Sequence, residues 1–97
     1  MATSREMQAI VAQATSFQEK VGVALTDRAN TAFTSGTTQD KQIASAVVNN
    51  SGSAIRELSK ALAAAGLDMD STDAQIDSAI NVAWTDFLGI YLGIVSP

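Results

Sequence analysis

Apolar residues recur at every third or fourth position along almost the whole chain, which is the spacing of one face of an α-helix. The one proline is the final residue, Pro97, where it interrupts nothing. We therefore predict an all-α protein, a single helical domain over residues 1–97, arranged as a small up-down bundle of three to four helices. The expected helices span residues of about 4–34, 38–49, 53–65 and 73–94.

The first expected helix carries a narrow apolar seam of coiled-coil type. Some thirty residues at 1.5 Å each give a length of about 45 Å, more than a compact domain of this size measures. Either the molecule is elongated, or Gly22 marks a bend in this helix. The seam consists of Met7, Ile10, Ala14, Phe17, Val21 and Ala24, continued by Leu25, Ala29 and Ala32.

Polar clusters that contain glycine divide the remaining helices. The segment 35–38, Ser-Gly-Thr-Thr, gives the clearest interhelical turn. The segment 49–53 predicts a second break, after which Ser53 caps the next helix. Gly66 is placed to end that helix at a C′ position, and Leu67 supplies the apolar contact that accompanies a Schellman motif.

The last expected helix begins at a capping box and is the most apolar part of the chain. Thr72 can accept a hydrogen bond from the backbone amide of Gln75, whose side chain can reach back. The segment 82–95 holds the only Trp, the only Tyr and a single charge, Asp86. On a regular helix its apolar residues form two stripes: Ile76, Ile80, Ala83, Phe87, Ile90 and Ile94 toward the core, and Trp84, Leu88, Tyr91 and Val95 beside them.

About half of the circumference of this helix is apolar, which is more than one neighbouring hairpin covers easily. Either the first three helices enclose it as the centre of the bundle, or one stripe packs inside the monomer and the other packs against another subunit. Large aromatic residues are enriched at subunit interfaces. We predict an interface formed by Trp84, Phe87, Leu88, Tyr91, Leu92 and Val95.

Charged residues are scarce and unevenly distributed along the chain. Hydrophobic residues make up 46% and charged residues only 16%, against roughly 25% charged in ordinary soluble domains. Lys60 is the last basic residue, so all five charges in residues 61–97 are aspartates. A phosphate backbone is bound by clustered Lys and Arg, and neither half of the chain has such a cluster. We expect a neutral, polar surface that repels its own copies weakly and does not bind nucleic acid.

The residue types that most enzyme mechanisms need are missing from the sequence. It contains no Cys and no His, which removes thiolate and imidazole chemistry. The acids from Asp68 to Asp77 have the alternation of a calcium loop, but Asp73 and Ala79 stand where such a loop needs Gly and Glu. We interpret these acids as charges that favour the start of a helix. We expect Asp86 to face water or a neighbouring chain rather than to act as a general acid, and we predict no catalytic residue, metal or cofactor.

Neither end of the chain favours a targeting or membrane segment. The opening MATSREMQAIV has no basic region followed by an apolar run, so we expect no secretory signal and a location in the cytoplasm or within an assembled particle. A helix of residues 82–95 would span about 21 Å against a hydrocarbon core of about 30 Å, so a membrane span is not favoured.

The size and helical layout resemble those of small secreted proteins of the WxG type, and the length is similar to that of helical needle subunits of secretion systems. Trp84 departs from the first pattern, because Thr85 and Asp86 follow it inside an expected helix. The neutral composition rich in Ala, Ser and Thr is similar to that of bacteriophage particle proteins. We expect a non-enzymatic structural or assembly subunit that binds itself or other protein subunits. The alternative is a small binding module, an adaptor or regulator, that uses the face around Trp84 and Tyr91.

Overall fold

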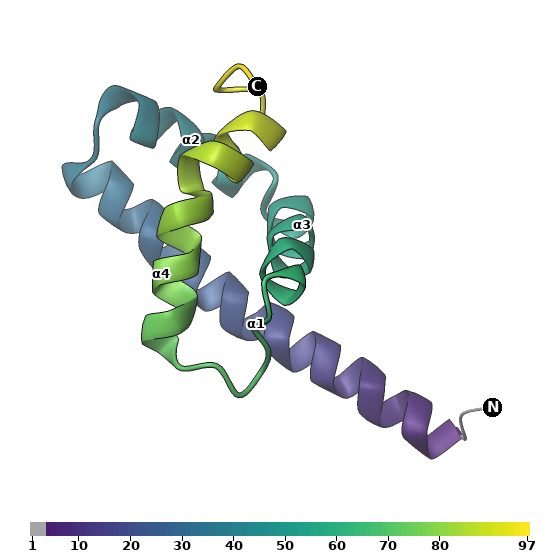
Figure 1. Cartoon of the computed structure of the whole chain (residues 1–97). Helices are drawn as coiled ribbons and strands as arrows, with labels where there is room; N and C mark the ends of the chain where they lie inside the picture. The colour runs from purple at the N-terminus through teal and green to yellow at the C-terminus, as the bar shows by residue number, and fades with distance from the viewer. Residues whose placement is uncertain (1–3) are drawn as a thin grey trace.

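The chain folds as the all-α protein that the sequence predicts, with four α-helices packed against one another. The computed structural model describes the backbone from Ser4 to Pro97 and the side chains from Ser16 onward. The fourth α-helix continues directly into a π-helix, η1. The elements are α1 (Ser4–Ser35), α2 (Thr38–Asn49), α3 (Ser51–Ala64), α4 (Asp73–Ala83) and η1 (Trp84–Gly89) (Figure 1).

Helix α1 runs through Gly22 without interruption and sets the length of the molecule. Its 32 residues at 1.5 Å each come to about 48 Å, and the principal extents of the molecule are 49, 24 and 21 Å. The molecule is therefore elongated. A Cβ at Gly22 would lie 3.2 Å from Cδ1 of Ile55, so the glycine serves the close approach of α3 to α1. Of the predicted seam, Met7, Ile10 and Ala14 lie outside the residues whose side chains are described.

The turn between α1 and α2 is narrow and requires a glycine. The amide of Gly36 donates to the carbonyl oxygen of Ala32 at 2.9 Å, and a Cβ on Gly36 would lie only 2.7 Å from that oxygen. Thr37 then caps α2, because its hydroxyl accepts from the amide of Asp40 and its own amide donates to the Asp40 carboxylate. The predicted turn at 35–38 is confirmed, and it fixes the Asp40 carboxylate on the first turn of α2.

The two cap motifs predicted around the α3–α4 connection are also confirmed. Gly66 adopts φ +95°, and the amide of Leu67 donates to the carbonyl oxygen of Leu62 at 3.0 Å, as in a Schellman motif. The Leu67 side chain packs against the core. Thr72 and Gln75 form the reciprocal hydrogen bonds of a capping box at the start of α4.

Helices α2 and α3 are separate, and the break between them falls at Asn50. The prediction that Ser53 caps α3 is wrong, because α3 already begins at Ser51. The Ser53 hydroxyl instead donates to the carbonyl oxygen of Asn50 at 3.1 Å, a local bond typical of serine inside a helix. The side-chain amide of Asn50 donates to the carbonyl oxygen of Ala46 at 2.9 Å, so Asn50 also closes α2.

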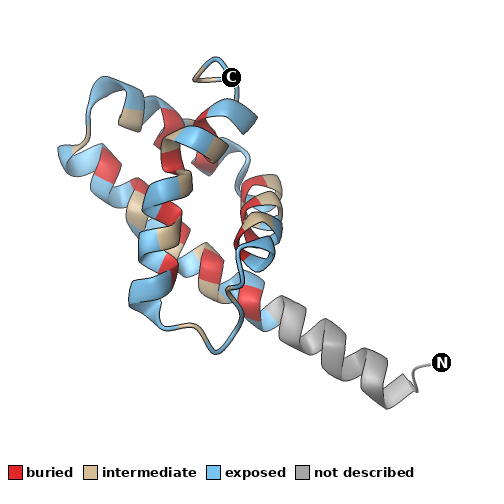
Figure 2. Cartoon of the chain, in the orientation of Figure 1, coloured by how far each residue is buried: buried red, intermediate tan, exposed pale blue. Residues whose placement is uncertain are grey.

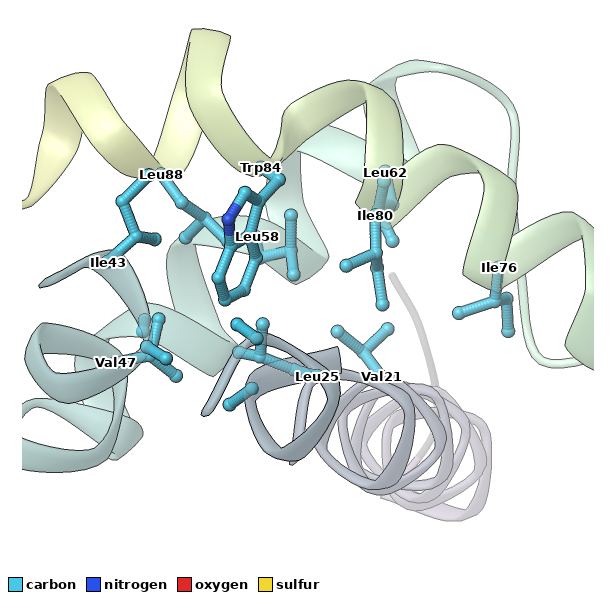
Figure 3. Close-up of a cluster of buried hydrophobic side chains, with 14 of the residues drawn as sticks. Val21, Leu25, Ile43, Val47, Leu58, Leu62, Ile76, Ile80, Trp84 and Leu88 are labelled. Carbon is cyan, nitrogen blue, oxygen red and sulfur yellow. The ribbon is translucent and has the colours of Figure 1, made fainter. Parts of the chain in front are cut away.

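The hydrophobic core is built from one side of each helix, where the buried positions of the bundle face one another (Figure 2). Trp84 is the largest of the fully buried side chains and projects from the C-terminal helix toward Leu25 of α1 (Figure 3). The buried apolar residues are Phe17, Val21, Leu25, Ala29, Ala32, Ile43, Ala44, Val47, Ala54, Leu58, Leu62, Ile76, Ile80, Trp84 and Leu88.

Helix α4, η1 and the residues up to Tyr91 form one continuous helix, called the C-terminal helix here. Its core residues follow a period of four: Ile76, Ile80, Trp84 and Leu88. On a regular α-helix four residues exceed one turn by about 40°, so such a row rotates away from the core as it continues. The π-helix η1 has i→i+5 hydrogen bonds and therefore a wider turn. The wider turn cancels the rotation and keeps Leu88 in the core row.

This geometry corrects the predicted division of the helix into two stripes. Trp84 and Leu88 belong to the core row, whereas Ile90, predicted to face the core, is 37% exposed. The helix also ends before the predicted residue 94, because Gly93 adopts φ +77° and the amide of Ile94 donates back to the carbonyl oxygen of Gly89 at 2.8 Å. The last residues therefore fold back on η1.

Candidate interaction surface

Trp84 is held by polar contacts at both the edge and the face of its ring. Its Nε1–H donates to Oδ1 of Asp40 at 3.2 Å, and Cζ of Arg28 lies 4.3 Å from the ring centroid. Arg28 is oriented by a 2.7 Å hydrogen bond from its Nε to Oδ1 of Asn81. The ring is 1% exposed, so its buried N–H has found the partner that a buried indole needs. These contacts join α1, α2 and the C-terminal helix.

The Asp40 carboxylate is stabilised in its charged form. The hydrogen bond from the backbone amide of Thr37 is the largest cause that holds the pKa of Asp40 below its usual value of 3.8, and partial desolvation opposes it. The Thr37 hydroxyl, the Trp84 indole and the positive charge of Arg28 lower the pKa of Asp40 further. Asp40 is therefore ionised at neutral pH and acts as an acceptor for Trp84.

A half-open cleft of about 450 Å³ lies between α1 and α4, next to this cluster. Asp27, Arg28 and Thr31 contribute from α1, and Asp77 and Asn81 contribute from α4. The volume is within the range of about 300–1,000 Å³ that small-ligand sites occupy. Carboxylates outnumber the single guanidinium along its walls, so the field in the cleft favours a basic group.

The opposite side of the C-terminal helix carries exposed residues at the same spacing of four. Val82 is 75% exposed, Ile90 is 37% exposed, and Asp86 lies between them on the surface. Tyr91, beside this row, is 46% exposed, and its ring stacks on Phe87 with centroids 6.2 Å apart and planes 5° from parallel. Phe87 packs against the core and so anchors the exposed ring. Val82, Asp86, Ile90 and Tyr91 are called the outer face below.

Two of the six residues predicted to form an interface lie in the core of the chain itself. Trp84 is 1% exposed and Leu88 is 0% exposed. A partner cannot contact these side chains in this fold, because the other helices already cover them. Trp84 follows Ile80 by four residues at the end of α4, and the wide turn of η1 then keeps Leu88 in the core row, from which a regular helix would have rotated it.

The remaining four predicted residues lie at or near the surface. Tyr91 is the most exposed, while Phe87 and Leu92 are partly buried and pack against the core. Val95 belongs to the returning C-terminal segment, where its amide donates to the carbonyl oxygen of Gly89 at 2.9 Å. Tyr91 is thus the predicted residue best placed to meet a partner.

The ammonium group of Lys20 lies against the backbone of the acidic α3–α4 connection. Nζ of Lys20, on α1, donates to the carbonyl oxygens of Met69, at 3.3 Å, and of Ser71. It also lies 4.0 Å from Oδ1 of Asp73, which stands in the first turn of α4 where a negative charge is favourable. Among the described residues, no three acidic side chains come close enough to hold a metal ion.

The carboxylates on α1, α2 and α3 have different surroundings from Asp86. Asp40 accepts from Trp84, Asp27 lines the cleft, and Glu57 lies 3.4 Å from Lys60 on α3. Asp86 itself is exposed on the outer face. The arrangement of these acids is that of caps, ion pairs and surface charges.

Sequence reasoning missed the two residues that hold Trp84 in place. Asp40 could have been found as the N3 residue of a capping box, because it follows Thr37 by three positions. Arg28 gave a weaker signal, as a single basic residue on the flank of the apolar seam of α1. Neither pattern indicates that the two side chains meet on one indole ring.

Comparison of the chain with known proteins gives no match. The chain matches no protein-family model, and no curated protein or solved structure is significantly similar to it. Within the described residues, no helix combines the length and the apolar character that a membrane crossing requires.

Proposed function

We propose that the protein is a non-enzymatic assembly subunit that associates with copies of itself, or with other subunits of a larger particle, through the outer face of its C-terminal helix. The observation that carries the proposal is the exposure of Val82, Ile90 and Tyr91 on one surface. Exposed aromatic and aliphatic side chains that gather on one face are typical of subunit interfaces.

The composition of the chain supports association of its copies rather than a purely monomeric state. Only 16% of its residues are charged, and the formal net charge is −4. A surface with few charges repels copies of itself weakly, so a modest apolar contact suffices to hold subunits together. The Phe87–Tyr91 stack adds to this, because a ring that is already ordered loses little conformational entropy on binding.

Light scattering on the purified protein across micromolar to high micromolar concentrations tests the proposal. The expected result is a mass above that of the monomer that rises with concentration. Replacing Val82 and Tyr91 together by serine, the outer-face variant, removes much of the exposed apolar surface and is expected to give a monomer with an unchanged circular-dichroism spectrum.

Met69→Ser is the matched control, because Met69 is an exposed apolar residue, 39% exposed, in the α3–α4 connection away from the outer face. It is expected to associate as the wild type does. A wild-type protein that stays strictly monomeric at high micromolar concentration would contradict the proposed function.

The cleft between α1 and α4 favours a second candidate, a small binding module. Its net acidic walls suit a lysine or arginine side chain of a peptide, and the Trp84 ring next to it reports on occupancy. A titration with acetylated tetralysine should shift the Trp84 emission and saturate. The same titration of a variant with Asp27→Asn and Asp77→Asn should leave the emission unchanged, and equal responses from both proteins would remove this candidate.

A further inference from the structure

A second apolar surface lies on the other side of α1 from the C-terminal helix. It is a groove of about 230 Å³ between α1, α2 and α3. Leu25, Ala29 and Val47 form its buried floor, while Val48 and Ile55 form its walls. Val48 is 59% exposed. An apolar cavity of about 150 Å³ is enough to admit benzene, so this groove has room for the ring of an aromatic side chain.

The groove and the outer face open on different sides of the molecule. On α1, the groove is lined by Thr26, Ala29 and Asn30, whereas Arg28 and Thr31 line the cleft toward α4. At 100° per residue, the centres of these two sets are about 175° apart around the α1 axis. The outer face points away from α1 on the far side of α4. One molecule therefore cannot bring its own outer face to its own groove.

The charges beside the two surfaces have opposite signs. Asp86 lies within the outer face, and every charge from residue 61 onward is an aspartate. On α3, Arg56 directly follows the groove residue Ile55, and its side chain is 56% exposed. Lys60, one turn later, is 68% exposed. Glu57 lies 3.9 Å from Nε of Arg56 and 3.4 Å from Nζ of Lys60, so these three side chains together carry one net positive charge. An outer face that met another outer face would bring only acids together, whereas an outer face that met the groove would place Asp86 near Arg56.

We propose that the outer face of one copy binds in the groove of a second copy, with Tyr91 inserted between Val48 and Ile55. This inference rests on the proposed function and specifies how the subunits meet. The two contact surfaces differ, so the interface is heterologous. Each added subunit leaves one free groove and one free outer face, and the assembly therefore grows head to tail as a filament or a ring instead of stopping at a symmetric dimer.

Two variants that each block one surface test the mode of assembly. The outer-face variant carries Val82→Ser and Tyr91→Ser, and the groove variant carries Val48→Glu. All three positions are substantially exposed, so both proteins are expected to fold, which circular dichroism and thermal unfolding verify. In native mass spectrometry the wild type should form species larger than a dimer, and each variant alone should be monomeric. An equimolar mixture of the two variants should give a one-to-one dimer and nothing larger.

The outcomes separate this inference from the proposed function. A groove variant that assembles as the wild type does would overturn the inference and leave self-association through the outer face intact. A wild type that stops at a dimer, or a mixture that contains only monomers, would also overturn it. A wild type that is monomeric throughout would overturn both.

A charge exchange gives a second, independent measurement that does not depend on the groove variant. Arg56→Glu and Asp86→Arg should each weaken association about two- to fivefold, as expected of an exposed ion pair. The protein that carries both changes should recover wild-type association, because the opposite charges again face each other across the interface. An absence of recovery in the double variant would overturn the pairing of these two surfaces.

Discussion

The two sides of the C-terminal helix carry similar apolar side chains but have different surroundings. Trp84 and Leu88 on the inner side are 1% and 0% exposed, while Val82 and Tyr91 on the outer side are 75% and 46% exposed. The inner side is fixed by core packing and by the contacts of Trp84. On the outer side, the ring of Tyr91 stacks on Phe87. Stability should therefore depend on the inner side, and association should depend on the outer side.

Trp84→Ala should produce the largest loss of stability of the changes considered. Truncating a buried tryptophan removes its packing and leaves a cavity, at a cost of about 3–5 kcal/mol. It also leaves Asp40 and Arg28 without the ring that they contact. Urea unfolding followed by circular dichroism measures the loss. Trp84→Phe, which keeps an aromatic ring but removes the N–H donor, should cost less, and equal losses for the two variants would contradict this account.

Gly89→Ala should have the next largest effect, because it tests the packing of the returning C-terminal segment on η1. The added Cβ would lie 2.8 Å from Cγ2 of Val95 and 3.3 Å from Cδ1 of Ile43, so these side chains must move. Overpacking of this kind costs about 1–3 kcal/mol, and the better helix propensity of alanine offsets part of that cost.

Gly52→Ala is the control for that substitution, because a Cβ at Gly52 meets nothing within 4 Å. It should stabilise the protein through helix propensity alone, by at most about 0.5–1 kcal/mol, because Gly52 stands in the first turn of α3. Thermal unfolding of the two variants should therefore move in opposite directions. If the unfolding temperatures of both variants shifted in the same direction, the close contact with Val95 would not be destabilising.

Asp40→Asn should have a smaller effect that depends on pH. The folded state lowers the pKa of Asp40 below 3.8, so the charged carboxylate contributes stability that is fully present above that value. The contribution declines as the pH falls through the lowered pKa. The variant should be less stable than the wild type at pH 6, and the difference should shrink as the pH falls below 3.8 and through the lowered pKa of Asp40. A difference that stayed constant across urea titrations at several pH values would contradict a role for the charge.

The outer-face variant should have the smallest effect on stability. Substitutions at exposed positions usually change the free energy of unfolding by less than about 0.5 kcal/mol, and loss of the Tyr91 stack on Phe87 adds to that. Unfolding at a low concentration, where the wild type is expected to be monomeric, isolates this quantity. A loss of more than about 1 kcal/mol would show that the two sides of the helix are not energetically separate.

The features that the sequence predicted correctly depend on residues close together in the chain. The turn at Gly36, the Schellman glycine Gly66 and the capping box of Thr72 and Gln75 each involve a few neighbouring positions whose chemistry is specific. The four helices followed from these signals and from apolar spacing, with an error at Ser53, where any of several adjacent polar residues could have capped α3.

The features that it did not predict depend on contacts between distant segments. The core position of Trp84 involves contacts with Asp40 and Arg28 on other helices, and that of Leu88 depends on the wide turn of η1, which has no short sequence signature of its own. Arg28 and Asn81 meet across 53 positions of sequence, and Lys20 and Ser71 across 51. Such pairs arise only when the helices are packed, so no local pattern reveals them.

The ammonium group of Lys20 bears on the chemical conditions in which the fold can persist. Loops that rely on calcium lose their ligand when the ion is scarce or chelated, and many extracellular modules bind it only at about 10⁻⁴–10⁻³ M. Here the positive group that Met69 and Ser71 bind is covalently part of α1. It cannot be diluted, exchanged or removed by a chelator. The carbonyl oxygens of Met69 and Ser71 therefore have a positive partner that stays with the chain whatever the supply of divalent ions.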